Sequence, residues 1–262
     1  AVRLLYNCGE CYYCRTGHAN LCERAQKKPV REGLLIGPGG LCDYVIVNTG
    51  YLFKIPDTLS YEEASLTEPL ACVVHSVTKA NIQLGEDVVV IGGGIMGQYH
   101  VMLAKRRGAR VIMSEVDESR RTLARKLGAD ITFNPMEKDP VEYVKSLTEG
   151  RGADVVFNTT AIPSVVPQAI AMTGKAGRMI QYSSMHPDAP APVSPQMLHG
   201  NEPILTGSIS PDVHDFFTAN RLLSGGIIDC KPLIAKKFPF EQAQQAFEAA
   251  IVPGTFRVII TD

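Results

Sequence analysis

A glycine-rich junction at residues 87–97, DVVVIGGGIMG, limits the fold of this chain more than any other stretch. A run of apolar, β-branched residues typical of a buried strand ends at Gly92, and a pattern of helical period follows over 95–108. Gly92, Gly94 and Gly97 form a G-x-G-x-x-G pattern at the turn between the two. This context predicts the first strand–turn–helix unit of a parallel, dinucleotide-binding sheet.

Strand-like and helix-like segments alternate along the rest of the central region. We expect strands at 110–114, 130–133, 153–159 and 177–183, and helices at 118–128, 140–148 and 163–173. The alternation implies parallel βαβ units, so we predict the α/β class with a Rossmann-type, doubly wound parallel sheet. Outside this region we expect a strand at 41–47, a helix whose start is marked by Pro69 at its first helical position, and an irregular, proline-rich crossing at 184–203.

Each glycine of the turn has its own predicted task. Gly92 permits the tight turn, Gly94 lets the backbone approach a pyrophosphate, and Gly97 lets the helix lie close to the sheet. Glu115 ends the next predicted strand, where a carboxylate can bind both ribose hydroxyls of NAD and repel the extra phosphate of NADP. Arg120, one helical turn further on, is a second cofactor candidate. Because an arginine there can accommodate the extra phosphate of NADP, NADP remains the alternative coenzyme. A Rossmann-like domain without a dinucleotide is the other alternative.

Four of the seven cysteines lie close together, in the spacing C-x2-C-x2-C-x7-C. Four thiolates can close a tetrahedron around zinc, which leaves no position for water or substrate and stiffens the loop. An iron–sulfur cluster would favour a short last gap followed by proline, whereas here the last gap is long and Glu23 follows. We therefore predict a structural zinc site, with free or disulfide-paired thiols as the alternative. The predicted ligands are Cys8, Cys11, Cys14 and Cys22.

Charge and hydropathy indicate the kind of partner. The 262 residues include 26 basic and 27 acidic ones, and the formal charge of -1 gives no reason to expect nucleic acid or an anionic membrane. The 45% hydrophobic content suits one or two globular domains. The sequence shows neither an apolar run long enough to span a bilayer nor a signal-peptide pattern, so we predict a cytoplasmic protein that acts on small molecules.

Several motifs occur here in one order: the four-cysteine lobe, a GG-x-x-[DE]-Y segment (Gly39, Gly40, Asp43 and Tyr44), TEPLACVVH at 67–75, and the strand–GGGIMG–helix junction. In this combination the chain resembles a zinc-containing medium-chain dehydrogenase/reductase of the sorbitol, threonine and polyol dehydrogenase branch. The resemblance covers essentially all 262 residues and ends in FPFEQAQQAFEAAIVPGTFRVIITD, which is similar to that family's closing helix and strand.

The resemblance implies a domain division and an activity. Residues 1–69 would be the remainder of a GroES-like, β-rich catalytic domain, residues 70–209 the NAD-binding domain, and residues 210–262 a return to the catalytic domain, with catalysis in the cleft. Hydride would pass between NAD and a secondary alcohol, a polyol or sugar alcohol, or its ketone, with zinc as Lewis acid. A dimer or tetramer is expected. Threonine dehydrogenase is the nearest alternative; a zinc-free, NADPH-dependent quinone reductase and a non-catalytic dinucleotide-binding protein are the others.

Further site residues follow only from the resemblance. Glu68 matches an acidic residue at or near the catalytic zinc. The alternative is a carboxylate at the start of a helix that is stabilised by the helix dipole. Met96 would lie against the nicotinamide ring, and Arg257 would reach the pyrophosphate. Packing without cofactor contact is the alternative for each, and it is the expectation for His75. The cofactor residues added in this way are Ile95, Met96, Tyr182, Ser184 and Arg257, with Tyr182 and Ser184 near the carboxamide.

The start of the chain raises a separate expectation. The family holds its catalytic zinc partly with a cysteine and a histidine that precede the four-cysteine lobe. The printed sequence begins at Ala1, shortly before Cys8. We therefore expect an N-terminal segment that these residues do not include, and no turnover by these residues alone.

Overall fold

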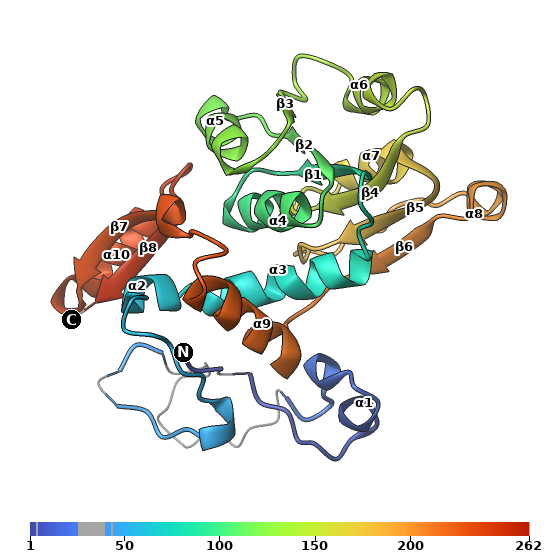
Figure 1. Ribbon diagram of the computed structural model, residues 1–262. Helices are drawn as coiled ribbons and strands as arrows, with labels where there is room; N and C mark the ends of the chain where they lie inside the picture. The colour runs from blue at the N-terminus through green and yellow to red at the C-terminus, as the bar shows by residue number, and fades with distance from the viewer. Residues whose placement is uncertain (4, 26–39, 43, 262) are drawn as a thin grey trace. The chain divides into compact units, whose positions relative to one another are not determined.

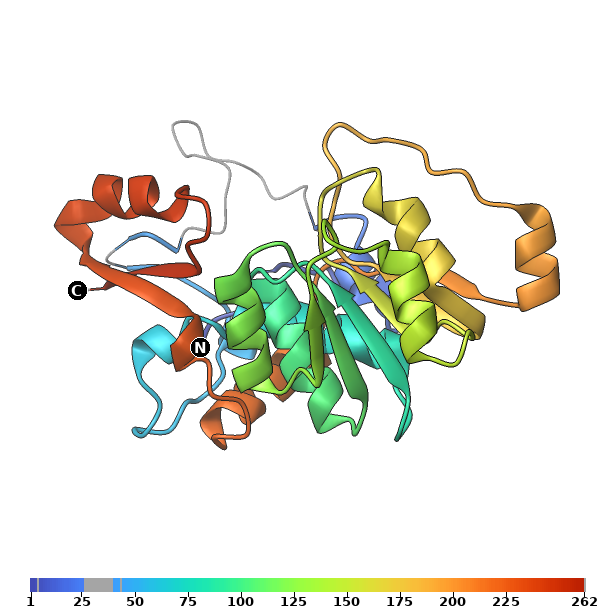
Figure 2. The same ribbon diagram turned by 90° about the horizontal axis from the view of Figure 1, so that it is seen from above.

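The computed structural model of the chain (Figures 1 and 2) describes residues 1–3, 5–25, 40–42 and 44–261. The chain divides into two compact units. The predicted domain boundaries after residues 69 and 209 stay a prediction. Unit 1 holds Ala1–His75 and Ile209–Asp229, and unit 2 holds Ser76–Ser208 and Cys230–Asp262.

Unit 2 is built on a six-stranded, fully parallel sheet in the order β3-β2-β1-β4-β5-β6. This is the strand order of a Rossmann fold, so the predicted α/β class with a doubly wound sheet is confirmed. The central strand β1 is buried along its whole length, in keeping with the apolar run that follows its first residue, Asp87. The strands are β1 (Asp87–Ile91), β2 (Arg110–Ser114), β3 (Ile131–Phe133), β4 (Ala153–Asn158), β5 (Thr173–Gln181) and β6 (Ile204–Gly207).

Helices cover both faces of this sheet (Figure 2). On one face, Val144 of α6 and Met172 of α7 share a core cluster with Val89, Ile112 and Val156 of the strands. Helix α4 packs against β1 and β2 and is buried from Gly97 to Ala104. The helices are α4 (Ile95–Arg106), α5 (Glu118–Leu127), α6 (Pro140–Leu147), α7 (Val165–Met172) and α8 (Pro195–Asn201).

Side-chain caps fix where several of these helices begin. The Asp117 carboxylate accepts from the N–H of Arg120 at the start of α5, and the Asp139 carboxylate accepts from two N–H groups at the start of α6. These bonds satisfy donors that the first turn of a helix leaves unpaired. The predicted helices at 118–128 and 140–148 therefore begin at the expected residues.

The last part of unit 2 forms a smaller parallel pair of strands. Strands β7 (Ile234–Pro239) and β8 (Arg257–Thr261) pair in parallel, and helix α10 (Ala243–Ala250) connects them and packs on both. The predicted closing helix and strand are therefore present. Two short 3-10 turns, η3 (Lys231–Leu233) and η4 (Phe240–Gln242), complete the segment.

Unit 1 contains mainly short helices. Two of them, α2 and α9, pack together, and α9 begins with a capping box formed by Asp212 and Asp215. The described residues of unit 1 form no strand, and their β-pairing is limited to one isolated antiparallel bridge between Val2 and Leu52. Helix α3 passes from unit 1 into unit 2 after His75. The elements are α1 (Tyr12–Arg15), η1 (Ala19–Leu21), η2 (Thr49–Tyr51), α2 (Tyr61–Ala64), α3 (Thr67–Ala80) and α9 (Val213–Ser224).

Two predictions of local structure are wrong. Residues 41, 42 and 44–47 form no strand, and Val45 and Ile46 are exposed, because a strand is stabilised by pairing and neither sheet of the described residues includes this segment. The crossing at 184–203 contains helix α8, whose N-cap Ser194 accepts from the N–H of Met197. Gly39 and Asp43 lie outside the described residues. None of the described helices is long and apolar enough to cross a membrane.

Candidate functional site

The glycine-rich turn joins β1 to α4 in unit 2. Gly92 has φ +96°, in the left-handed region that favours glycine, and its N–H donates to the carbonyl of Ser114 at 2.9 Å. A Cβ on Gly97 would lie 1.8 Å from the carbonyl oxygen of Gly92, so only glycine lets α4 approach the turn this closely. A Cβ on Gly94 would meet no atom within 4 Å. The turn is therefore closely packed at Gly97 and open at Gly94, where a pyrophosphate is expected.

Glu115 follows β2, and its carboxylate is bonded to the turn. One oxygen accepts from the N–H of Gly93, and the other accepts from the N–H of Asp117 at 2.9 Å. The side chain of Arg120 in α5 reaches to 3.9 Å from the same carboxylate. The structure thus brings Glu115 and Arg120 together beside the glycines, while their roles in binding a ribose stay a prediction.

Two polar side chains that the sequence did not reveal, one buried and one half-buried, hold the turn in place. The amide of Gln98 donates to the carbonyls of Gly93 and Arg120, at 3.0 Å each. The hydroxyl of Thr159, directly after β4, donates to the carbonyl of Gly92 at 3.1 Å. Gln98 is fully buried within α4, and a polar residue at a buried helix position was the signal that could have found it.

The residues predicted at the nicotinamide end lie in two segments of unit 2. Ile95 and Met96 begin α4 and are half-buried, and Tyr182 follows β5. Ser184 is exposed. Met96 and Tyr182 share one neighbour, His100: its Nδ1 lies 2.8 Å from the Met96 carbonyl, and its ring centroid lies 4.8 Å from that of Tyr182.

Arg257, the predicted pyrophosphate residue, begins β8. Its charge acts on the buried Tyr99 of α4. The preceding residue, Phe256, lies with its ring 6.0 Å from the guanidinium carbon of Arg120. The start of β8 therefore lies near the Arg120 side of the turn, and the pyrophosphate contact of Arg257 stays a prediction.

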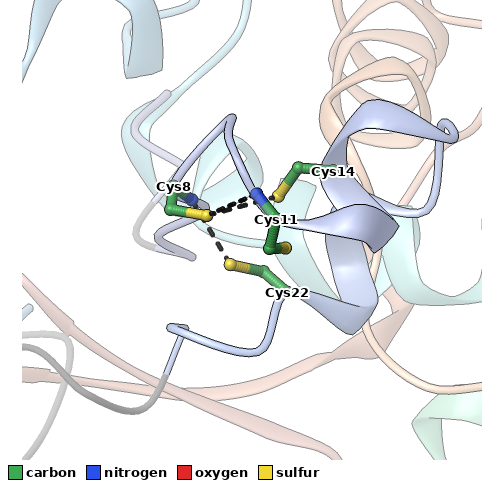
Figure 3. Close-up of side chains that lie close together, drawn as sticks. All are labelled: Cys8, Cys11, Cys14 and Cys22. Atoms are coloured by element: carbon green, nitrogen blue, oxygen red, sulfur yellow. Dashed lines mark hydrogen bonds between the residues drawn. The ribbon is translucent and has the colours of Figure 1, made fainter.

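In unit 1 the four cysteines gather into one lobe (Figure 3). Their sulfur atoms all lie within 4.8 Å of one another, and those of Cys8 and Cys14 are 3.9 Å apart. A regular tetrahedron with zinc–sulfur bonds of about 2.3 Å has sulfur–sulfur edges of about 3.8 Å. The predicted ligand set, Cys8, Cys11, Cys14 and Cys22, therefore fits a tetrahedral ion. Among the described residues this is the one group of three or more potential ligands with such spacing.

Backbone donors surround these sulfur atoms. The sulfur of Cys8 accepts from the N–H groups of Glu10 and Cys11, at 3.4 Å each. The sulfur of Cys22 accepts from the N–H groups of Cys8 at 3.3 Å and Arg24 at 3.4 Å. Hydrogen bonds to a thiolate favour its ionised form, which is the form that binds a metal.

The pKa values of the thiols reflect this environment. The N–H groups of Cys14 and Glu23 lower the pKa of Cys11 to about 6. Burial opposes ionisation of Cys22, but the N–H groups of Cys8 and Arg24 lower its pKa. Burial raises the pKa of Cys14 to about 12. The lobe thus combines groups that ionise readily with one that needs a cation to lose its proton.

Glu68, the predicted ligand of a catalytic zinc, lies in the first turn of α3 and is exposed. The thiol of Cys72, one turn further on, donates to its carboxylate at 3.3 Å. Burial and the charge of Glu68 raise the pKa of Cys72, so this thiol keeps its proton. In the described part of the chain Glu68 belongs to no group of three potential ligands, and its metal role stays a prediction.

His75, predicted to be a satisfied packing residue, has both ring nitrogens engaged. Nδ1 lies 2.7 Å from the carboxylate of Asp215, and Nε2 lies 3.4 Å from the amide of Asn20. Burial opposes ionisation of Asp215, but the hydrogen bond from His75 lowers its pKa. Asn20 belongs to the cysteine lobe and also donates to the carbonyl of Ile209 at 2.9 Å. One polar network therefore links the lobe to α3 and α9 within unit 1.

Two family models match the chain: an alcohol dehydrogenase GroES-like domain over residues 1–57 and a zinc-binding dehydrogenase over residues 96–225. The D-arabitol-phosphate dehydrogenase of Enterococcus avium is 32% identical over 259 residues, which are 97% of this chain and 72% of the relative. The chain belongs to the zinc-dependent medium-chain dehydrogenases. The predicted family and the oxidoreductase class are therefore confirmed.

Further members of the family have similar identity. The sorbitol dehydrogenase of Bacillus subtilis is 30% identical, over 96% of this chain and 70% of its own length. The L-threonine 3-dehydrogenase of Caldanaerobacter subterraneus is 32% identical, over 97% of this chain and 72% of its own length. A solved structure from Sinorhizobium meliloti, determined bound to NADP, has a TM-score of 0.88 at 27% identity and covers 98% of this chain and 74% of its own. These matches confirm the combination of Rossmann and GroES-like parts.

Proposed function

We propose that this chain is a zinc-dependent dehydrogenase that transfers hydride between NAD and a secondary alcohol of the polyol or sugar-alcohol class. The observation that carries the proposal is the glycine-rich turn of a family member, open at Gly94 and flanked by the carboxylate of Glu115. A dinucleotide needs both features, because its pyrophosphate requires close approach to backbone N–H groups and its ribose requires an acceptor.

The residues of unit 2 would bind and orient the coenzyme. The N–H group of Ile95, in the first turn of α4, has no partner within the helix and would be available to a phosphate over Gly94. Glu115 would accept from the ribose hydroxyls, and Arg120 would lie on the outer side of that ribose. When bound, the nicotinamide accepts hydride, and a catalytic zinc favours loss of the alcohol proton.

The two proposed metal roles differ. The four thiols of the lobe fill a tetrahedron, so an ion there would stabilise the loop and leave no position for substrate. Glu68 is exposed, and the bond from Cys72 engages only its Oε1 among the described residues, which suits a ligand of a second, catalytic ion. We therefore assign structure to the lobe and chemistry to the side of α3 that carries Glu68.

The substrate class rests on the relatives. D-arabitol-phosphate and sorbitol dehydrogenases are named for polyols, and an L-threonine 3-dehydrogenase matches equally well. All three names describe oxidation of an alcohol, so the mechanism is common to them. A polyol is our proposed substrate and L-threonine the rival. A cytoplasmic location and a dimer or tetramer complete the proposal.

Titration calorimetry with NAD and NADP, followed by a substrate panel, tests this function. We expect tighter binding of NAD, and NADH formation with D-arabitol phosphate or sorbitol when the full-length protein carries zinc. NADH formation with L-threonine alone would favour the rival. If the folded protein binds neither coenzyme, the proposed function is wrong. If it reduces quinones with NADPH and without zinc, it is a quinone reductase and not an alcohol dehydrogenase.

A further inference from the structure

A fully buried histidine lies beneath the predicted nicotinamide end of the site. His100 of α4 has no exposed surface, and both of its ring nitrogens have partners. Nδ1 lies 2.8 Å from the carbonyl oxygen of Met96, and Nε2 lies 2.9 Å from the hydroxyl of Ser76. A buried imidazole with two well-placed partners is held in one orientation.

The partners also determine the tautomer of the ring. A carbonyl oxygen can only accept, so the proton of the neutral imidazole of His100 resides on Nδ1 and is donated to Met96. Nε2 is then an acceptor and receives the hydroxyl proton of Ser76. Burial lowers the pKa of His100 to about 4, so the ring is neutral near pH 7. One uncharged ring therefore joins the start of α4 to α3.

The same ring contacts the end of the sheet. Its centroid lies 4.5 Å from that of Phe157 in β4 and 4.8 Å, edge to face, from that of Tyr182 after β5. The first pair is tilted and the second edge to face, and ring packing of this kind adds stabilisation beyond simple burial. His100 is thus in contact with Met96 and Tyr182, two residues from separate segments that were both predicted at the nicotinamide.

We propose that His100 is a positioning residue for the nicotinamide half of the coenzyme, because it fixes Met96 and Tyr182 relative to each other from below. This inference rests on the proposed NAD site. The adenosine and pyrophosphate half has separate supports, since Gln98, Thr159 and Glu115 hold the glycine-rich turn without contribution from the His100 ring. Loss of His100 would therefore affect one half of the ligand and leave the other.

Binding of NAD and of ADP-ribose, which lacks the nicotinamide, separates the two halves. In His100→Phe the ring packing is kept and both hydrogen bonds are lost. We expect NAD affinity to fall about tenfold by calorimetry, with ADP-ribose affinity within twofold of wild type. In His100→Asn an amide N–H can still reach the Met96 carbonyl, and we expect partial recovery of NAD affinity. His199→Phe, at an exposed histidine of α8, is the matched control and should change neither.

Equal loss of NAD and ADP-ribose affinity in His100→Phe, or loss of neither, would overturn the positioning role. If that variant does not fold, Ser76→Ala removes only the Nε2 partner and should lower the ratio of NAD to ADP-ribose affinity by a smaller factor; an unchanged ratio would also overturn it. Failure of wild type to bind either ligand would instead reject the proposed coenzyme site itself, and this inference with it.

Discussion

The four-cysteine lobe of unit 1 and the glycine-rich turn of unit 2 are both short loops, but different forces hold them. In the lobe, α1 and η1 bury no residue, and the buried side chains are two ligand candidates, Cys11 and Cys22. At the turn, β1 is buried throughout and α4 is buried from Gly97 to Ala104. Apolar burial therefore stabilises the turn and contributes little to the lobe.

The polar contacts of the two loops also differ, because those of the lobe involve ionisable sulfur atoms and those of the turn involve uncharged groups. In the lobe, backbone N–H groups point at sulfur atoms, and several thiolates this close together repel one another unless a cation balances them. At the turn, Gln98 and Thr159 donate uncharged hydrogen bonds to backbone carbonyls. The comparison teaches that the turn is formed by its own contacts before a ligand binds, whereas the lobe has few contacts besides those to sulfur and should depend on the proposed ion for its conformation.

Removal of the lobe ion should have the largest effect. Structural zinc contributes on the order of 10 kcal/mol to the folding of small zinc domains, so Cys11→Ser should lose zinc and lower the melting temperature of the protein markedly. NAD affinity should change little, because the turn does not depend on the lobe. Metal analysis and calorimetry provide the measurements. Cys42→Ser, outside the ligand set, is the control, and unchanged zinc content in Cys11→Ser would contradict the lobe assignment.

Alanine at the two ends of the turn should separate packing from binding. Gly97→Ala places a methyl group against the Gly92 carbonyl and should cost about 3 kcal/mol of unfolding free energy or more. Gly94→Ala meets no neighbour and changes only the N-cap of α4, so it should cost about 1 kcal/mol of unfolding free energy or less. Its NAD affinity should nevertheless fall by about tenfold or more, because the methyl group prevents the pyrophosphate from approaching the backbone. Denaturant unfolding and calorimetry distinguish the two, and a Gly94→Ala variant with native NAD affinity would argue against the site.

Glu115→Ala should change coenzyme preference. The carboxylate also accepts from the N–H of Gly93, so both coenzymes should bind less well when it is removed. The ribose role predicts that NAD loses roughly tenfold more affinity than NADP, because only NADP is relieved of repulsion. Calorimetry with both coenzymes gives the ratio of NAD affinity to NADP affinity in the wild type and in the variant. A parallel loss would show that Glu115 only supports the turn.

The smallest effect is expected at the polar network of unit 1. Asp215→Asn should cost about 1–2 kcal/mol of unfolding free energy, because the bond to His75 loses its charge. Since His75 lowers the pKa of Asp215 below its ordinary value of 3.8, the carboxylate's contribution is present above pH 3.8 and is lost as the pH falls through the folded-state value. The difference between wild type and variant should therefore shrink at acid pH.

Asp188→Asn, at an exposed aspartate, is the control for that measurement and should match wild type throughout. Because any loss of an ion from the lobe at low pH would affect wild type and variant alike, the difference between them isolates Asp215. A difference that is constant across this pH range would show that the charge of Asp215 has no role.

The regular part of unit 2 could be predicted from sequence because its signals are local. The apolar run of β1, the turn glycines and the caps Asp117 and Asp139 each act within a few residues. The strand expected at 41–47 failed because strand formation depends on a partner elsewhere in the chain. Helix α8 was missed because the prolines around it outweighed the Ser194–Pro195 start signal.

The site was predictable only in part, for the same reason. The glycines and the cysteines carry their roles in their spacing. His75 and Asp215 lie 140 positions apart, and their contact has no signature in the sequence. Nothing in the spacing of apolar residues in α4 distinguishes His100 from its neighbours. Its proposed positioning role depends on the ring contact with Tyr182, which forms only once the sheet has folded.

The closeness of the sulfur atoms of Cys8 and Cys14, 3.9 Å apart, also has a chemical cost. If the ion leaves in the presence of oxygen, one thiol can be oxidised to a sulfenic acid, and the thiolate of Cys11 or Cys22, whose pKa is lowered, can attack that sulfur with loss of water; the resulting disulfide removes two ligands at once. Zinc lost in this way would not return until a reductant cleaved that link, so the redox history of a sample would govern whether its lobe can be reloaded.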